Sequence, residues 1–108
     1  MKKTMIVLML CASALTSQAM GADAFALAGA KQCLICHDFR SELMIGPPFR
    51  DIARRYEEVS NAKMMLAEVI QSGTEGHWKA SRMPAASARV PVSKEEAEVL
   101  ADYVLNFE

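Results

Sequence analysis

One short segment, Cys33-Leu34-Ile35-Cys36-His37, constrains the fold of this chain more than any other. Residues three and four positions apart lie on the same face of a helical turn, so Cys33, Cys36 and His37 project together. Two thiols at this spacing, followed directly by histidine, form the C-x-x-C-H signature of covalent haem attachment. The thiols can add to the two vinyl groups of a haem, and the imidazole can reach the iron. The segment therefore predicts a chain that folds around one covalently bound haem c.

Other roles for the cysteine pair have less support in the sequence. A thioredoxin-like redox pair is expected beside a βαβ pattern, which this sequence lacks. A zinc site needs more ligands, but His77 is the only further histidine and there is no second cysteine pair. A simple disulfide between Cys33 and Cys36 is a further alternative.

The beginning of the chain has the pattern of a secretory signal peptide. Two lysines precede an uncharged apolar run from Met5 to Leu15, and small residues follow it. The run is too short to span a bilayer as a permanent helix, so we expect no stable membrane anchor after cleavage. We expect residues 1–19 to be removed, with cleavage as late as 22–24 as the alternative, and residues 20–108 to fold as one domain in the periplasm.

Removal of the signal peptide changes the composition of the part that folds. Lys2 and Lys3 are lost from a chain with 12 Lys and Arg and 13 Asp and Glu, so the net charge falls from −1 to −3. This balance offers no basic patch for nucleic acid. Cys11 is also lost, which leaves Cys33 and Cys36. A domain of roughly 90 residues buries a modest core, and a bound cofactor is one way to complete it.

Hydrophobic periodicity predicts an all-α fold with about four helices around one core and no strand. The expected helices cover residues 24–31, 49–56, 60–73 and 93–105, with a long loop over 73–91. Ser93 and Glu96 form a capping-box pattern at the start of the last helix. The expected apolar faces contain Phe25, Ala28 and Gly29; Phe49, Ile52, Ala53 and Tyr56; Met65, Leu66, Val69 and Ile70; and Ala97, Leu100, Ala101 and Val104.

A second iron ligand is expected opposite His37, because iron bound on both sides rearranges little when its charge changes. Met64 and Met65 lie within a predicted helix, where core packing is the better interpretation. Met44 follows His37 too closely to reach the opposite haem face. Met83 lies in the long loop and precedes a stiffening proline, so this segment can wrap around a flat cofactor. Histidine with methionine is a known ligation of c-type haem, which makes Met83 the favoured ligand.

His77 and Trp78 are the other candidate haem contacts in this loop. His77 is the alternative second ligand, because iron bound by two histidines is also chemically reasonable. Trp78 needs a partner for its indole N–H when buried, and a haem propionate would serve. Solvent exposure for His77 and plain packing for Trp78 are the simpler interpretations.

The chain after the signal peptide resembles the small bacterial class I c-type cytochromes. The resemblance rests, in order along the chain, on Cys33–His37, Ile45–Phe49, Ile70–Trp78 with Gly73 and Gly76, Met83-Pro84 and Ser93–Leu105. It implies a small cytochrome c fold wrapped around one haem, in which Phe25 and Gly29 cross the last helix.

The resemblance also implies roles for single residues. Pro47 would offer its carbonyl to the outer nitrogen of His37, which fixes the ring and raises its basicity. Trp78 would donate to a haem propionate. Lys31 would lie near a propionate, with a solvated lysine as an equal alternative.

Three features depart from the family pattern. Val69 falls where some relatives carry a propionate-binding arginine. Ala85 and Ala86 follow Pro84, where some relatives have an asparagine that bonds the methionine sulfur. Residues 85–91 also form a longer connection than usual. Such groups influence the reduction potential.

Together these features favour a monomeric one-electron carrier between periplasmic donor and acceptor proteins. No residues stand out for acid–base catalysis, so we expect no enzymatic activity. A dedicated cytochrome subunit of a periplasmic dehydrogenase or oxidase is one alternative. A haem enzyme or ligand sensor, with iron opened by loss of Met83, is another.

Overall fold

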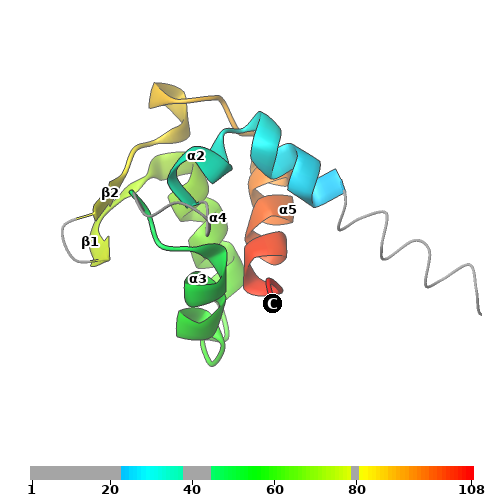
Figure 1. Cartoon of the computed structure of the whole chain (residues 1–108), viewed down its shortest axis with the longest axis vertical. Helices are drawn as coiled ribbons and strands as arrows, with labels where there is room; N and C mark the ends of the chain where they lie inside the picture. The colour runs from blue at the N-terminus through cyan, green and yellow to red at the C-terminus, as the bar shows by residue number, and fades with distance from the viewer. Residues whose placement is uncertain (1–22, 38–44, 79–80) are drawn as a thin grey trace, which may run out of the picture.

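The computed structural model describes residues 23–37, 45–78 and 81–108, with the side chains of residues 76–78 and 81 outside the description. The expected signal peptide and Met44 therefore lie outside the described residues. Helices dominate the described part (Figure 1): residues 23–30, α2 (Cys33–His37), α3 (Phe49–Tyr56), α4 (Ala62–Ser72) and α5 (Lys94–Leu105). Between α4 and α5 lie β1 (Thr74–Trp78), β2 (Ser81–Met83) and the short 3-10 helix η1 (Ala86–Ala88). None of the helices described here has the length and apolar character needed to cross a membrane.

Helix α5 follows the sequence pattern closely. Its expected apolar residues Ala97, Leu100, Ala101 and Val104 are all buried. The expected capping box is also present, because the backbone N–H of Glu96 donates to the Ser93 hydroxyl at 3.1 Å, and the Glu96 carboxylate accepts from the Ser93 N–H at 2.9 Å. Two otherwise unpaired N–H groups at the start of the helix are thereby satisfied.

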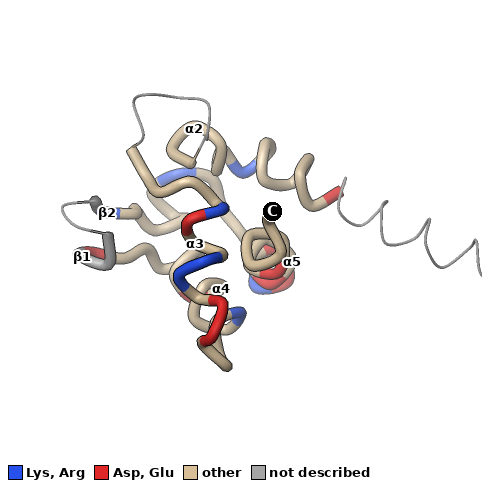
Figure 2. The backbone as a smooth tube through the Cα atoms, turned by 60° about the horizontal axis from the view of Figure 1, so that its bottom comes forward, with Lys and Arg blue, Asp and Glu red and all other residues tan. Residues whose placement is uncertain are grey.

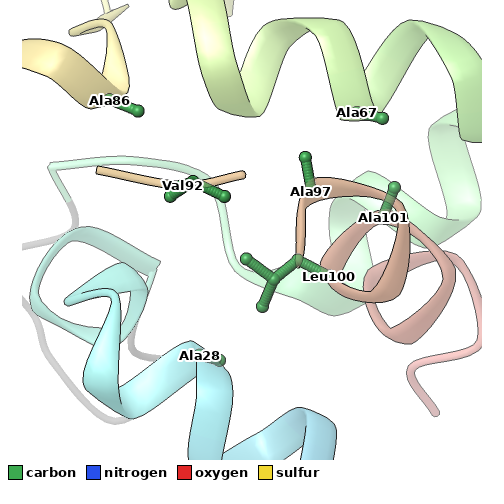
Figure 3. Packing of buried hydrophobic residues seen from close by; sticks show 7 residues of the cluster. All are labelled: Ala28, Ala67, Ala86, Val92, Ala97, Leu100 and Ala101. Atoms are coloured by element: carbon green, nitrogen blue, oxygen red, sulfur yellow. The ribbon is translucent and has the colours of Figure 1, made fainter. Parts of the chain in front are cut away.

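The main core is built largely from small side chains. Ala67 of α4 faces Ala97 of α5, and Ala28 of the first helical segment faces Leu100 (Figure 3). Leu100 is the largest fully buried side chain of the described residues, at 1% exposure. Alanines let the helices approach closely, but they bury little apolar surface. The larger apolar residues Leu66 and Ile70 are only partly buried at the edge of this cluster.

A second cluster packs α3 against the end of α5. Phe49 and Ile52 are buried on the expected face of α3 and contact Val104. Phe49 also meets Tyr103 and Phe107 edge to face, with ring centroids 6.1 and 5.7 Å apart. These contacts fix the position of Phe49, which borders the functional site.

The expectation that residues 73–91 form a loop without strands was wrong. Strands β1 and β2 pair antiparallel, with Thr74 opposite Met83 and Glu75 opposite Arg82. The last pair also forms an exposed ion pair at 3.1 Å. The strands are short and mostly polar, so they lack the alternation of apolar residues by which strands are predicted.

The expected contact face of the first helical segment was correct for Ala28 but wrong for Phe25 and Gly29. Phe25 is 53% exposed, whereas Ala24 and Ala28 are buried and Leu27 packs against the core. Gly29 is exposed, and a Cβ added there would meet nothing within 4 Å. The face that contacts the core is therefore rotated by one residue position from the expected face, and alanine rather than glycine provides the close approach.

Candidate haem-binding site

Helix α2 brings the three residues of the C-x-x-C-H motif to one cleft. Gln32, at φ 61°, ends the preceding helical segment, and α2 begins in a new direction directly after it. Cys33 and Cys36 are free, half-buried thiols that line the cleft together with His37. Burial raises the pKa of the Cys33 thiol. The expected common face of this helical turn is therefore confirmed.

Residues 46–49 fix the position of the His37 ring. Its Nδ1 lies 2.6 Å from the carbonyl oxygen of Pro47, which is the contact that the family resemblance implied. Because a carbonyl can only accept, Nδ1 donates, and Nε2 keeps its lone pair for a metal. Burial lowers the pKa of His37, although the hydrogen bond to Pro47 acts in the opposite direction. The lowered pKa favours the neutral ring that binding to a metal requires. Phe49 stacks on the ring with centroids 5.4 Å apart.

Gly46 is required beside this ring. A Cβ at Gly46 would lie 2.9 Å from Cε1 and 3.1 Å from Nδ1 of His37. The glycine therefore lets the loop approach the imidazole closely enough for Pro47 to accept its hydrogen bond.

Met83 lines the same cleft as the motif. It is the last residue of β2, and its side chain is half-buried. Gly73, at φ 75°, connects α4 to β1, and a Cβ there would overlap the carbonyl oxygen of Met83 and lie 2.7 Å from the Ala85 nitrogen. The glycine thus allows the end of α4 to pack directly against the Met83 backbone.

The cleft has a volume of about 260 Å³ and a predominantly apolar lining. Besides the residues already named, apolar side chains from α3, α4 and α5 line it: Ile52, Leu66, Val69, Ile70, Leu100 and Val104. Leu66 and Ile70, which are only partly buried at the edge of the main core, thus both face this cleft. A flat apolar group in this cleft would complete their burial.

Three other expectations have different outcomes. His77 and Trp78 belong to β1, but their side chains are outside the description, so their roles stay predictions. Lys31 has two partners within the protein. Its ammonium group donates to the carbonyl of Pro91 at 2.8 Å and pairs with Glu96 at 2.9 Å.

Arg89 is a cleft residue that the sequence reasoning missed. Its Nε donates to the Pro84 carbonyl and its Nη2 to the Ile70 carbonyl, both at 2.8 Å. It lies in the long connection before α5, where no motif or periodicity distinguishes it from other loop arginines.

The donor set fits a covalently bound haem. The cleft presents two half-buried thiols, an imidazole with Nε2 available and a thioether, within an apolar lining. Across residues 23–37, 45–78 and 81–108, no group of three His, Cys, Asp or Glu side chains could hold a metal ion. Cys33 and Cys36 would tether the haem, and His37 and Met83 would bind its iron.

Comparisons with known proteins find close relatives, although no family model matches the chain. Cytochrome c-551 of Stutzerimonas stutzeri is 36% identical over 107 residues, covering 98% of each chain. Cytochrome c-552 of Nitrosomonas europaea is 35% identical over 79 residues, covering 73% of each. The crystal structure of wild-type Nitrosomonas europaea cytochrome c552 superposes with a TM-score of 0.68 at 34% identity, covering 77% of this chain and 98% of that one.

Proposed function

The chain belongs to the small class I c-type cytochromes, and from this premise we propose that it is a periplasmic one-electron carrier with haem iron bound by His37 and Met83. The protein carries one covalently bound haem c and transfers electrons; it is not an enzyme. The periplasmic location, the axial ligands and the roles of single residues are the finer parts of the proposal.

The observation that carries the ligand assignment is that His37 and Met83 line one apolar cleft together with both motif cysteines. When bound, the haem supplies an iron that gains or loses one electron. Cys33 and Cys36 hold it covalently, and Pro47 keeps the His37 ring in one orientation and tautomer. A thioether ligand favours the reduced state, giving a higher potential than two imidazoles would.

The surroundings of the two ligands suit a site that rearranges little. Phe49 stacks on His37, and Gly73 packs against the Met83 backbone. The predominantly apolar lining of the cleft favours an apolar group over water inside it. We also assign Trp78 to a haem propionate, as the family resemblance implies, because a buried indole N–H needs a hydrogen-bond acceptor.

The signal-peptide pattern supports export, with residues 1–19 removed and residues 20–108 forming the haem domain. Donor and acceptor proteins of the periplasm would be the partners of this monomer. Lys, Arg, Asp and Glu lie along α3, α4 and α5, whereas α2, which carries the cysteines, has none of them (Figure 2).

Carbon monoxide binding to the reduced protein tests the closed iron. The wild type should take it up slowly or not at all near neutral pH, whereas Met83→Ala should bind it readily. His77→Ala is the matched control and should behave as the wild type. If His77→Ala opens the iron instead, the ligand assignment fails while the carrier function survives. Immediate uptake by the wild type would favour an enzyme or sensor with an open site.

A further inference from the structure

The connection from Met83 to α5 is anchored to the rest of the protein along its length. Ala86 and Val92 are buried, at 4% and 8% exposure, within the main core cluster (Figure 3). The side-chain amide of Gln71 in α4 donates to the Val92 carbonyl at 3.2 Å. The extra residues of this connection therefore form a packed part of the domain, directly beside the proposed ligand.

Arg89 ties this connection to α4 next to Met83. It follows η1, and its guanidinium group bridges the carbonyls of Pro84 and Ile70, each at 2.8 Å. The planar, rigid fork of a guanidinium group can hold two acceptors at once in a fixed geometry. Helix α4 has no basic residue in its own last turn, so Arg89 also provides the positive charge that a helix C-terminus favours.

Arg89 also lines the haem cleft as a half-buried cation. A positive charge held in the cleft would oppose the additional positive charge of oxidised iron. Arg89 therefore acts on the site both through its two hydrogen bonds and through its positive charge.

We propose that Arg89 is a positioning residue that holds the Met83-Pro84 segment against α4 and raises the reduction potential. The adjacent Ala85 and Ala86 have no side-chain donor, so the bridging guanidinium provides the polar anchor at this point. The proposal rests on the assignment of Met83 as an iron ligand. It predicts that loss of the bridge weakens Met83 ligation, and that loss of the charge stabilises the oxidised protein.

Two measurements on the haem-loaded protein separate these effects. Imidazole titration of the ferric protein reports how easily Met83 is displaced, because a weaker internal ligand raises the apparent affinity for imidazole. Arg89→Gln and Arg89→Lys should both bind imidazole roughly tenfold more tightly than the wild type, because neither reproduces two charge-assisted hydrogen bonds. In a redox titration, the ratio of oxidised to reduced protein at a given potential should rise about threefold to tenfold in Arg89→Gln. The ratio should rise much less in Arg89→Lys, which keeps the positive charge.

Arg50→Gln is the matched control, because Arg50 is exposed and its Nη2 donates to the backbone oxygen of Glu108, away from the haem cleft. It should leave both titrations unchanged. The near-infrared thioether band of the untreated ferric proteins shows whether Met83 is bound before imidazole is added. If the wild type has this band and the Arg89 variants match it in both titrations, only the inference about Arg89 is overturned. If the wild type lacks the band, the ligand assignment falls and the inference with it.

Discussion

Replacing Gly73 with alanine tests how closely the end of α4 must approach the Met83 segment. Gly73 has φ 75° and ψ −179°, a conformation nearly restricted to glycine that costs other residues about 1–3 kcal/mol. The added Cβ would also overlap the Met83 carbonyl oxygen and lie 2.7 Å from the Ala85 nitrogen. These are backbone atoms that cannot rotate away, so the overlap adds roughly 1–3 kcal/mol. We therefore expect a total destabilisation of about 2–6 kcal/mol.

Thermal unfolding of the haem-loaded protein, followed by circular dichroism, measures this loss. In a domain of this size each kcal/mol lowers the Tm by roughly 4–8 °C, so the Tm of Gly73→Ala should fall by at least about 8 °C. The thioether band of the ferric protein should weaken as well, because the backbone of Met83 must move. Gly29→Ala is the control: its Cβ meets nothing within 4 Å, and alanine favours a helix by about 1 kcal/mol over glycine.

The control should unfold at the wild-type temperature or slightly above it. If Gly73→Ala does the same and keeps its full thioether band, the close packing of α4 against Met83 is not what holds this segment in place.

Three further predictions concern haem attachment, the core and helix capping. Extraction with acidified organic solvent should leave the haem colour with the denatured wild-type polypeptide, and loss of all the colour would contradict covalent attachment. The Cys33→Ala, Cys36→Ala double variant should show little stable helix by circular dichroism, because the small core depends on the haem. A cooperative, native-like fold of this variant would contradict that dependence. Leu100→Ala should lower the free energy of unfolding by about 2–5 kcal/mol in urea titrations, because Leu100 is 1% exposed, and an unchanged midpoint would refute its burial. The hydrogen bond from the Ser93 N–H lowers the pKa of Glu96, so the ionised carboxylate stabilises the fold above its ordinary titration range, and this stabilisation is lost as the pH falls through the lowered pKa. The difference in Tm between the wild type and Glu96→Gln should therefore be largest near neutral pH and vanish in strong acid. A difference in Tm that does not change with pH would contradict this prediction.

The helices were predictable where one face carries a regular apolar pattern. The bounds of α3 agree with the expected residues 49–56, and α5 buries the expected face. The pattern failed in the first helical segment, because several small residues there allow more than one face to be interpreted as apolar. The β1–β2 hairpin was missed because cross-strand pairing such as Glu75 with Arg82 leaves no apolar periodicity.

The site was predictable where its geometry is local. Cys33, Cys36 and His37 belong to one helical turn, so their spacing alone places them on a common face. The hydrogen bond between His37 and Pro47 was expected only through the family resemblance. Arg89 could not be found in this way, because its partners are backbone carbonyls supplied by distant or irregular parts of the chain, and carbonyls leave no mark in a sequence.

In the proposed function, Met83 binds the iron that His37 also binds. The ferric near-infrared spectrum tests it most directly, because a thioether on ferric iron gives a weak charge-transfer band there. We predict that the wild type shows this band, that Met83→Ala loses it and that His77→Ala keeps it. A wild type without the band, or a Met83→Ala variant that retains it, would contradict the account.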